Sequence, residues 1–177
     1  HLVRTEINRL ANLLDEFLDL ARPRQIEREK LSVQALLEQV VQLQRPLLER
    51  RHIAFETYCT PGLEVRGDAN KLKQVLINLL TNAVEALQEV DAPRIELRGE
   101  RSASGVHLSV SDNGPGVPVE LIGSAFTPFV TSKPSGTGLG LAVVQKIASQ
   151  HGGFAELVAR ERGTIALIHL PDAQVQS

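Results

Sequence analysis

The chain has 177 residues, with 42% hydrophobic and 23% charged side chains and a formal net charge of -2 at pH 7. This length suffices for one sizeable domain with an additional element, and the composition is that of an ordinary globular protein. A charge so near zero excludes a general attraction to nucleic acid or anionic membranes, so a bound anion must be held by local groups. No apolar run approaches the roughly 18 residues of a membrane span. Cys59 is the only cysteine, so no intrachain disulfide can form, and a reducing compartment is expected.

An amphipathic helix is predicted at the N-terminus, over 1–22. Such a helix cannot bury its apolar face alone, and it therefore needs a partner helix. Pro23 disfavours helical geometry in the residue before it, so we expect the helix to end there and a linker to follow over 23–31. The chain opens at His1 without a methionine, which indicates a fragment of a longer protein. The apolar residues follow a heptad spacing, at Val3, Ile7, Leu10, Leu14, Phe17 and Ala21.

Helices and strands alternate over the rest of the chain. Ser32 and Asp68 are suitable N-cap residues for two helices, because their side-chain oxygens can accept hydrogen bonds from the first-turn amides. A flexible tail is expected at 172–177. The predicted elements, in chain order, are a helix from 33 to about 47, strands at 53–58 and 63–66, a helix over 69–90, strands around 95–97 and 106–110, a helix over 139–150, and strands at 154–159 and 164–170.

Residues 113–137 are rich in Gly and Pro and show no clear periodicity. A long loop inside a compact domain is usually functional or disordered. The surrounding pattern predicts an α/β (α+β) two-layer sandwich at 32–171. It consists of a mixed sheet of about five strands covered on one face by about three helices, preceded by the N-terminal amphipathic helix.

Two asparagines, Asn78 and Asn82, lie one turn apart on the polar face of the helix predicted at 69–90, and Glu85 lies on the same stripe. Asn is a mediocre helix former, so its use twice at this spacing favours short amides aimed at one target. An amide oxygen is a suitable ligand for Mg²⁺, which usually keeps water and phosphate oxygens as its other ligands. The alternative is an ordinary solvated face.

A first glycine block follows a predicted strand, at Asp112-Asn113-Gly114-Pro115-Gly116. A carboxylate at this point can accept a hydrogen bond from an exocyclic amine such as that of adenine. The glycines allow the backbone to approach a flat ring closely. Taken alone, the block is equally typical of a simple β-turn.

A second glycine block, Gly136-Thr-Gly-Leu-Gly-Leu141, leads directly into a helix. Backbone amides at such a helix start form an anion site, and a flexible hinge is the alternative. The block is no Walker A loop, because no Lys-Ser/Thr pair follows it, and no strand precedes it as in dinucleotide-binding motifs. Between the two blocks, Phe126 and Phe129 are expected to anchor the loop or dock a partner. Lys133 is the only cation between Asp112 and Gly140, and it is either a phosphate contact or an ordinary exposed lysine.

In this order and spacing, the blocks resemble the catalytic domain of sensor histidine kinases over roughly 32–171. The segment 78–86 resembles their N box, and 126–129 resembles their F box. Gly163-Thr164 and Leu170-Pro171 resemble the last strands of that domain. The segment 129–136 is most similar to kinases of the nitrogen-regulation type. The helix at 1–22 resembles the second helix of the dimerisation and phosphoacceptor hairpin.

The resemblance implies the ATP-binding fold shared by gyrase, mismatch-repair ATPases, heat-shock chaperones and histidine kinases, with Mg²⁺ and ATP as cofactors. Asn82 would hold the metal, and Asp112 with Thr164 would hold adenine. Asn78 and Lys133 are the expected catalytic residues, acting on the γ-phosphate under a lid at 131–140. The implied nucleotide contacts are Asn78, Asn82, Glu85, Asp112, Gly114, Gly116, Val117, Thr131, Ser132, Lys133, Gly136, Thr137, Gly138, Leu139, Gly140, Leu141 and Thr164.

Position 78 discriminates between reactions. Related ATPases and protein-serine kinases carry a Glu four residues before the metal-binding Asn, and that Glu activates water or a hydroxyl group. The neutral amide of Asn78 cannot act as a general base, whereas neutral imidazole needs none. The residues therefore favour transfer to histidine over a gyrase-type ATPase, and a non-catalytic nucleotide- or partner-binding module of the same fold is a further alternative.

The five histidines of the chain all lack the acceptor context of the family, which is a following acidic residue and then Asn-Pro. We therefore expect the acceptor helix to lie upstream, so that the fragment binds ATP without autophosphorylating. The implied partners are that helix, a response regulator and, in the full-length parent, a second copy, while the fragment itself is expected to be a monomer. Neither nucleic acid nor direct membrane contact is expected, and the resemblance implies a bacterial protein in the cytoplasm or on the cytoplasmic side of a membrane.

Overall fold

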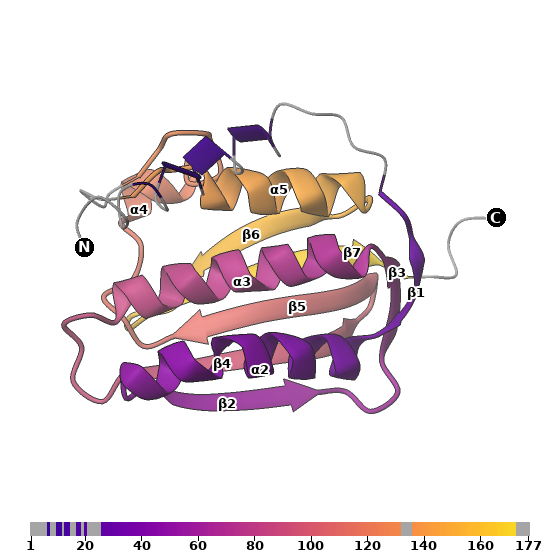
Figure 1. Cartoon of the computed structure of the whole chain (residues 1–177), viewed down its shortest axis with the longest axis horizontal. Helices are drawn as coiled ribbons and strands as arrows, with labels where there is room; N and C mark the ends of the chain where they lie inside the picture. Colours follow the sequence, from indigo (N-terminus) through magenta and orange to yellow (C-terminus); the bar gives the residue numbers. More distant parts are fainter. Residues whose placement is uncertain are drawn as a thin grey trace.

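The computed structural model describes residues 26–131 and 136–172 and, in the N-terminal segment, Ile7, Leu10, Ala11, Leu13, Leu14, Phe17, Leu18 and Leu20. Helices cover one face of a five-stranded sheet (Figure 1), which confirms the predicted two-layer α/β (α+β) sandwich. In chain order, the elements are β1 (Glu29–Ser32), α2 (Val33–Arg50), β2 (Ala54–Cys59), β3 (Glu64–Gly67), α3 (Ala69–Ala86), β4 (Arg94–Ser102), β5 (Gly105–Asp112), α4 (Val119–Ile122), α5 (Gly140–Gln150), β6 (Phe154–Ala159) and β7 (Thr164–Pro171).

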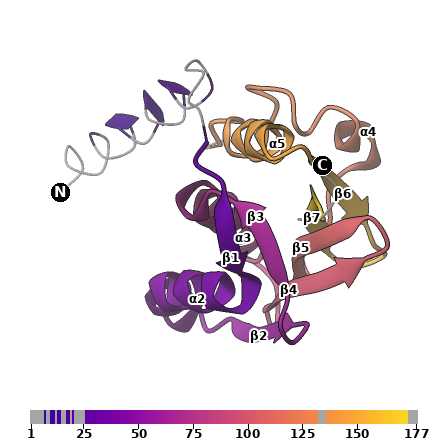
Figure 2. The same ribbon diagram turned by 90° about the vertical axis from the view of Figure 1, so that its right-hand side faces the viewer.

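The main sheet is mixed, as predicted, and its strand order is β2-β4-β5-β7-β6. β2 and β4 run parallel, whereas the other three neighbouring pairs are antiparallel. The last strand, β7, therefore lies inside the sheet between β5 and β6. The end view separates the two layers, with α2, α3 and α5 on one side of the strands (Figure 2).

The two predicted N-caps are confirmed. The Ser32 hydroxyl accepts a hydrogen bond from the Ala35 amide at 3.3 Å, and α2 begins at the next residue. Asp68 Oδ1 accepts from the amides of Asn70 and Lys71 at 3.0 and 3.1 Å, and α3 follows. Both boundaries were predictable because a cap is a local interaction between residues two or three apart.

The helix α3 ends at Ala86, earlier than the predicted residue 90. The chain continues in a turn, in which the Val90 amide donates to the Leu87 carbonyl at 3.2 Å. Leu87 is nevertheless buried, so its apolar character extends the helical pattern although the backbone has left the helix. Apolar spacing alone does not distinguish a final helical turn from a buried turn of this kind.

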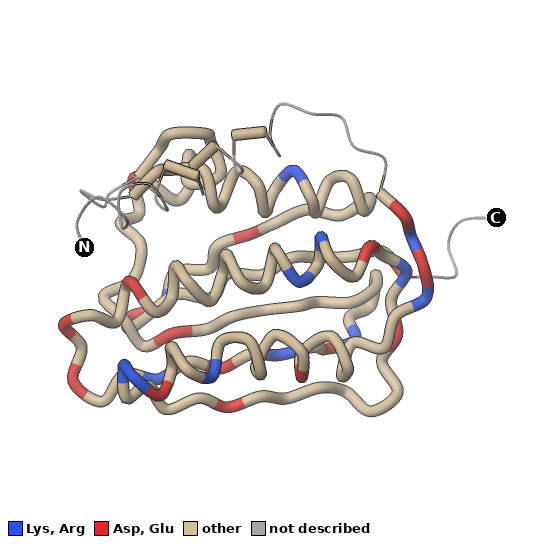
Figure 3. Tube along the Cα trace, viewed as in Figure 1, with Lys and Arg blue, Asp and Glu red and all other residues tan. Residues whose placement is uncertain are grey.

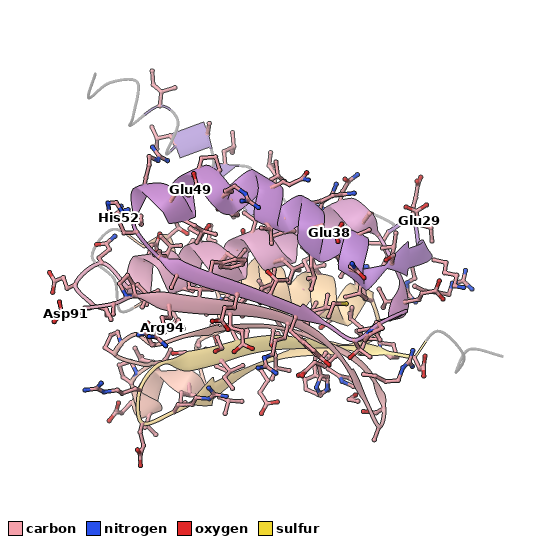
Figure 4. The ribbon with its side chains drawn as sticks, turned by 90° about the horizontal axis from the view of Figure 1, so that it is seen from below. Glu29, Glu38, Glu49, His52, Asp91 and Arg94 are labelled. Atoms are coloured by element: carbon pink, nitrogen blue, oxygen red, sulfur yellow. The ribbon has the colours of Figure 1, made fainter. Side chains whose placement is uncertain are left out.

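The core lies between the sheet and the three covering helices. Alternate residues of the central strands point inward, as predicted for Ile95 and Leu97 in β4 and for Val106 and Leu108 in β5, and all four are buried. The opposite sides carry polar residues. From below, the labelled Glu38 and Glu49 lie on the outer side of α2 (Figure 4), away from the sheet. The residues of the three covering helices that complete the core are Val33, Leu36, Leu37, Val40, Leu48, Leu72, Val75, Leu76, Leu79, Leu80, Ala83, Val84, Val143, Val144, Ile147 and Ala148.

The segment predicted as a linker over 23–31 contains most of a strand that the sequence did not indicate. β1 pairs antiparallel with β3 in a separate two-stranded sheet, so β3 does not join the main sheet. Lys30 forms an exposed ion pair with Glu64 across this sheet at 2.7 Å. A strand of four residues whose partners lie 32 to 38 positions further along the chain leaves no local pattern, which explains why it was missed.

The described residues of the N-terminal segment are helical, in agreement with the heptad pattern. The heptad residues Ile7, Leu10, Leu14 and Phe17 are 59%, 58%, 57% and 49% exposed, respectively. Val3 and Ala21, the remaining heptad positions, lie outside the described residues. The expected flexible tail also lies outside them, except for Asp172.

Acidic and basic residues are interspersed along the described trace (Figure 3), in line with the near-zero net charge. Across the part of the chain that the structure describes, no helix has the length and apolar character needed to cross a membrane.

Candidate nucleotide-binding site

The N box and the second glycine block meet between α3 and α5, which lie side by side on the sheet (Figure 1). The Asn78 side-chain amide donates to the Gly140 carbonyl at 3.2 Å and so links two positions 62 residues apart. Asn82 lies one turn further along α3, and Asn78 and Asn82 are both half-buried. Glu85, on the next turn, is exposed. The structure thus brings the two asparagines to the edge at which α5 begins.

The two helices are also joined at their other ends, through His151. The Asp68 amide donates to His151 Nε2 at 3.0 Å, and His151 Nδ1 lies 2.7 Å from the Ile147 carbonyl. A carbonyl only accepts, so the proton is on Nδ1 and the ring is neutral. Burial lowers the pKa of His151, and Arg28 lowers it further. The interpretation of His151 as a helix-terminal residue is confirmed, because it is the C-cap of α5, but its connection to α3 was not foreseen.

The first glycine block lies at the C-terminal end of α3. Asp112 Oδ1 accepts from the Gly114 amide at 2.8 Å. A Cβ at Gly114 would lie 3.2 Å from the Ala86 carbonyl oxygen, so the block packs directly against the last residue of α3. Gly116 has a φ of +84°, a conformation that glycine adopts without strain. Val117, which follows it, is half-buried.

Thr164 comes to the same place from the C-terminal end of the chain. Ser111 and Ile165 are register partners in the β5–β7 pair, so their neighbours Asp112 and Thr164 are adjacent across the strands. Thr164 is buried. Gly163 has a φ of +89°, and a Cβ at this position would overlap the Asp112 carbonyl oxygen. The sequence motifs gave no reason to single out Gly163 for contact with Asp112, and only the strand register reveals it.

The F box and the second glycine block are connected by the backbone. The Phe129 amide donates to the Gly138 carbonyl at 2.9 Å. A Cβ at Gly138 would lie 2.6 Å from the Phe129 carbonyl carbon, which leaves room only for glycine. Phe129 itself has a φ of +68°, an uncommon conformation for an aromatic residue. Phe126 packs against the core, whereas the Phe129 side chain is 65% exposed, so only Phe126 anchors the loop as expected.

The second glycine block contributes its backbone more than its side chains. Leu139 is fully buried, and its amide donates to Thr137 Oγ1 at 3.2 Å. Leu141 is half-buried and packs against the core. Of the remaining predicted contacts, Gly136 is half-buried and Thr131 is exposed. Ser132 and the predicted catalytic Lys133 lie outside the described residues.

The side chains at this site fit a magnesium ion that is held mainly by the phosphates of a bound nucleotide and only in part by the protein. Among the described residues, no group of three or more His, Cys, Asp or Glu side chains could hold a metal ion. Mg²⁺ commonly takes only one or two protein ligands and completes its shell with phosphate oxygens and water. A single half-buried amide such as that of Asn82 is compatible with this mode of binding.

The family model for histidine kinase-, DNA gyrase B- and HSP90-like ATPases matches residues 67–174. This range begins at the end of β3 and includes α3, both glycine blocks, α5 and β7. The chain therefore belongs to this family, and within it the chain corresponds to the ATPase catalytic domain of two-component sensor histidine kinases.

Two curated relatives illustrate the similarity. The chain is 36% identical over 166 residues to the C4-dicarboxylate transport sensor protein DctB of Rhizobium meliloti, covering 93% of this chain and 27% of DctB. It is 31% identical over 182 residues to the sensory histidine kinase/phosphatase NtrB of Vibrio alginolyticus, covering 97% of this chain and 51% of NtrB. The chain thus spans between about a quarter and about half of the length of these relatives.

A solved structure is also similar to this chain in its three-dimensional fold. The histidine kinase ThkA, in a crystal structure of its complex with the response regulator protein TrrA, superposes with a TM-score of 0.83 at 30% sequence identity. The match covers 97% of this chain and 50% of that chain.

Proposed function

We propose that the chain binds Mg²⁺–ATP and transfers the γ-phosphate to a histidine on a helix upstream of it. The observation that carries this proposal is the junction of α3 with α5, where Asn78 donates to the Gly140 carbonyl. The half-buried Asn82 lies one turn away from this junction. Phosphoryl transfer depends mostly on positioning and electrostatic stabilisation, and this junction provides fixed amides beside a glycine-rich helix start.

Each group around the junction has a role suited to its chemistry. Asn82 would hold the metal through its amide oxygen, and the bound metal would supply positive charge near the phosphates. Asp112 and the buried Thr164 face the base, and Asp112 accepts a hydrogen bond from the adenine amine. The first amides of α5 lie near the phosphates, where a helix N-terminus favours negative charge. Lys133 is proposed as the cation that completes the phosphate site.

Histidine is the preferred acceptor because the site lacks a general base at position 78. Asn78 donates through its amide to a backbone carbonyl and cannot accept a proton from water or a hydroxyl group. Neutral imidazole attacks phosphorus with a lone pair that it already carries, so no base is required. ATP hydrolysis of the gyrase type is therefore the less favoured reaction.

The partners follow from the same reaction. The phosphohistidine would pass its phosphoryl group to a response regulator, and the solved relative ThkA was crystallised with such a protein. The acceptor helix would belong to the chain's own kinase, acting as a homodimer in the bacterial cytoplasm or at the cytoplasmic side of a membrane.

The experiment that tests this function is titration calorimetry of ATP into the purified chain, with and without Mg²⁺. We expect micromolar binding that strengthens when the metal is present. Binding without turnover would separate this proposal from a gyrase-type ATPase, which would hydrolyse ATP in the presence of Mg²⁺. Absence of binding in both conditions would favour a module that recognises only a protein partner.

A further inference from the structure

Hydrogen bonds connect one half-buried side of α5 to the segment that precedes α2. Lys146 Nζ donates to the Leu20 carbonyl at 2.6 Å. The Arg28 guanidinium donates to the Gln150 carbonyl at 2.5 Å. Lys146 and Gln150 are four residues apart and therefore lie on the same side of α5. Figures 1 and 2 agree that the described N-terminal residues lie on the α5 side of the domain.

The Leu20 carbonyl is an acceptor that needs a partner. The last four carbonyls of a helix have no intrahelical donor. Pro23 has no amide proton and disfavours helical geometry in the residue before it, so the sequence predicts no intrahelical donor for the Leu20 carbonyl. These carbonyls carry the negative end of the helix dipole, which a lysine ammonium complements.

Lys146 is distinctive within its own helix. It is the only charged residue of α5, whose eleven residues are all described (Figure 3). Its contact with Leu20 is half-buried, and the Leu20 side chain packs against the hydrophobic core of the domain. At Leu20, the segment is therefore held by a charged hydrogen bond and an apolar contact at the same place.

We propose that this side of α5 is a docking surface for the end of the heptad helix and that Lys146 is its anchor. The occupant is the chain's own segment, held at Leu20 by Lys146 and at Arg28 by the end of α5. The anchor lies six residues, or about 9 Å, along α5 from Gly140. The same rigid helix thus connects the docking surface to the proposed phosphate site.

The functional meaning of this contact rests on the proposed function. If the heptad helix belongs to the hairpin that carries the acceptor histidine, Lys146 fixes the orientation of that hairpin relative to bound ATP. Lys146 is then a positioning residue, since it acts through the helix and touches neither ATP nor the acceptor.

The test measures the distance between the heptad helix and the domain by pulsed electron paramagnetic resonance. Spin labels are attached at Ala11→Cys and Gln42→Cys, which are both exposed helical positions, in a Cys59→Ser background. The parent chain should give one narrow distance distribution. Lys146→Met, which removes the ammonium and keeps the stem, should give a distribution about twice as wide or shifted, because the charged hydrogen bond at the end of the heptad helix is then lost and only weaker contacts and the linker hold it. Lys146→Arg should restore the narrow distribution.

Lys73→Met on α3 is the matched control, because it removes an equal charge from a half-buried position on another helix of the same domain. It should leave the distribution narrow. Far-UV circular dichroism verifies folding, and Arg28→Met replaces Lys146→Met if the latter does not fold. A broad distribution in the parent chain, or an unchanged one in Lys146→Met, would overturn the proposal. The measurement needs no nucleotide, so it stands apart from any failure to bind ATP.

Discussion

At the scale of single residues, the candidate site depends on positions where atoms approach closely. Gly163, Asp112 and Gly114 form one such group, since Asp112 accepts from the Gly114 amide while its own carbonyl lies against Gly163. A side chain at Gly163 would displace the strand end that carries Thr164. The geometry of the proposed adenine end of the site therefore depends on a residue that makes no polar side-chain contact.

Gly163→Ala should destabilise the fold by about 2 kcal/mol or more, because the added methyl group overlaps the Asp112 carbonyl and the backbone φ is positive. Urea unfolding followed by circular dichroism measures this loss. Gly123→Ala is the matched control, since a Cβ there would meet no atom within 4 Å and its φ of -66° is ordinary. Its effect should stay within about 0.5 kcal/mol. Equal stability of the two variants would contradict the described packing.

Asp112→Asn should weaken ATP binding by roughly 1 to 3 kcal/mol, because the amide presents a donor where the adenine amine needs an acceptor. Calorimetric titration measures the affinity, and GTP serves as the comparison nucleotide. Asp91→Asn, in the exposed turn before β4, is the control and should bind ATP as the parent chain does. Unchanged affinity in Asp112→Asn would remove the adenine role from this residue.

At the scale of elements, hydrogen bonds from Asn78 and to His151 connect α3 and α5 at both ends of α5. Asn78 joins the middle of α3 to the start of α5, and His151 joins the end of α5 to the start of α3. The second connection depends on pH, because His151 accepts from the Asp68 amide only while its Nε2 is unprotonated.

Stability should fall as the pH decreases from about 7.5 to about 5.5. Burial lowers the pKa of His151. Burial also lowers the pKa of His107, and the neighbouring His169 lowers it further. The unfolded chain then binds protons at a higher pH than the folded chain. The contribution of each group is complete above the unfolded value of about 6.5 and is lost as the pH falls toward the lowered folded value.

The measurement is the urea-unfolding free energy at several pH values. His151→Gln should be less stable at pH 7.5 and should show a weaker dependence on pH. His52→Asn, in an exposed turn with a φ of +51° that Asn tolerates, should keep the full dependence. If His151→Gln retains the slope of the parent chain, the buried ring is not the group that titrates.

The elements themselves were largely predictable from the sequence. The N-caps Ser32 and Asp68 predict the starts of α2 and α3, because capping is local. Ile95 and Leu97 predict β4, because apolar and polar residues alternate there. β1 was missed because its partner is remote, and α4 was missed because four helical residues inside a Gly- and Pro-rich loop leave too short a pattern. The N box and the two glycine blocks could be recognised from the order and spacing of their residues. The Asn78–Gly140 hydrogen bond could not, because it is a tertiary contact that no local pattern encodes. Likewise, nothing in the sequence separates Phe126, which packs against the core, from the exposed Phe129.

At the scale of the whole molecule, the described histidines lie away from the proposed phosphate site. His107 and His169 are in edge-to-face contact, with ring centroids 4.8 Å apart, and they extend from register partners in β5 and β7. His151 is buried at the far end of α5, and His52 lies in the exposed turn after α2. None of these positions resembles an exposed acceptor on a helix.

The chain alone should therefore remain unphosphorylated. Incubation with γ-labelled ATP and Mg²⁺ should leave no stoichiometric label after gel separation under alkaline conditions, which preserve phosphohistidine. Adding the upstream acceptor helix of the same kinase should produce acid-labile label. Stoichiometric label on the chain by itself would contradict the proposed upstream location of the acceptor.

The position of β7 inside the sheet has a consequence for biosynthesis. β6 is held in the sheet only through β7, and β7 also completes β5, so the sheet stays divided until the final strand is inserted. Residues 164–171 are the last strand to leave the ribosome. Until then, β5 and β6 each have an edge without the β7 partner. Folding of this domain should accordingly wait until β7 has left the ribosome, and a chain stopped before Thr164 should be recovered mainly as aggregate.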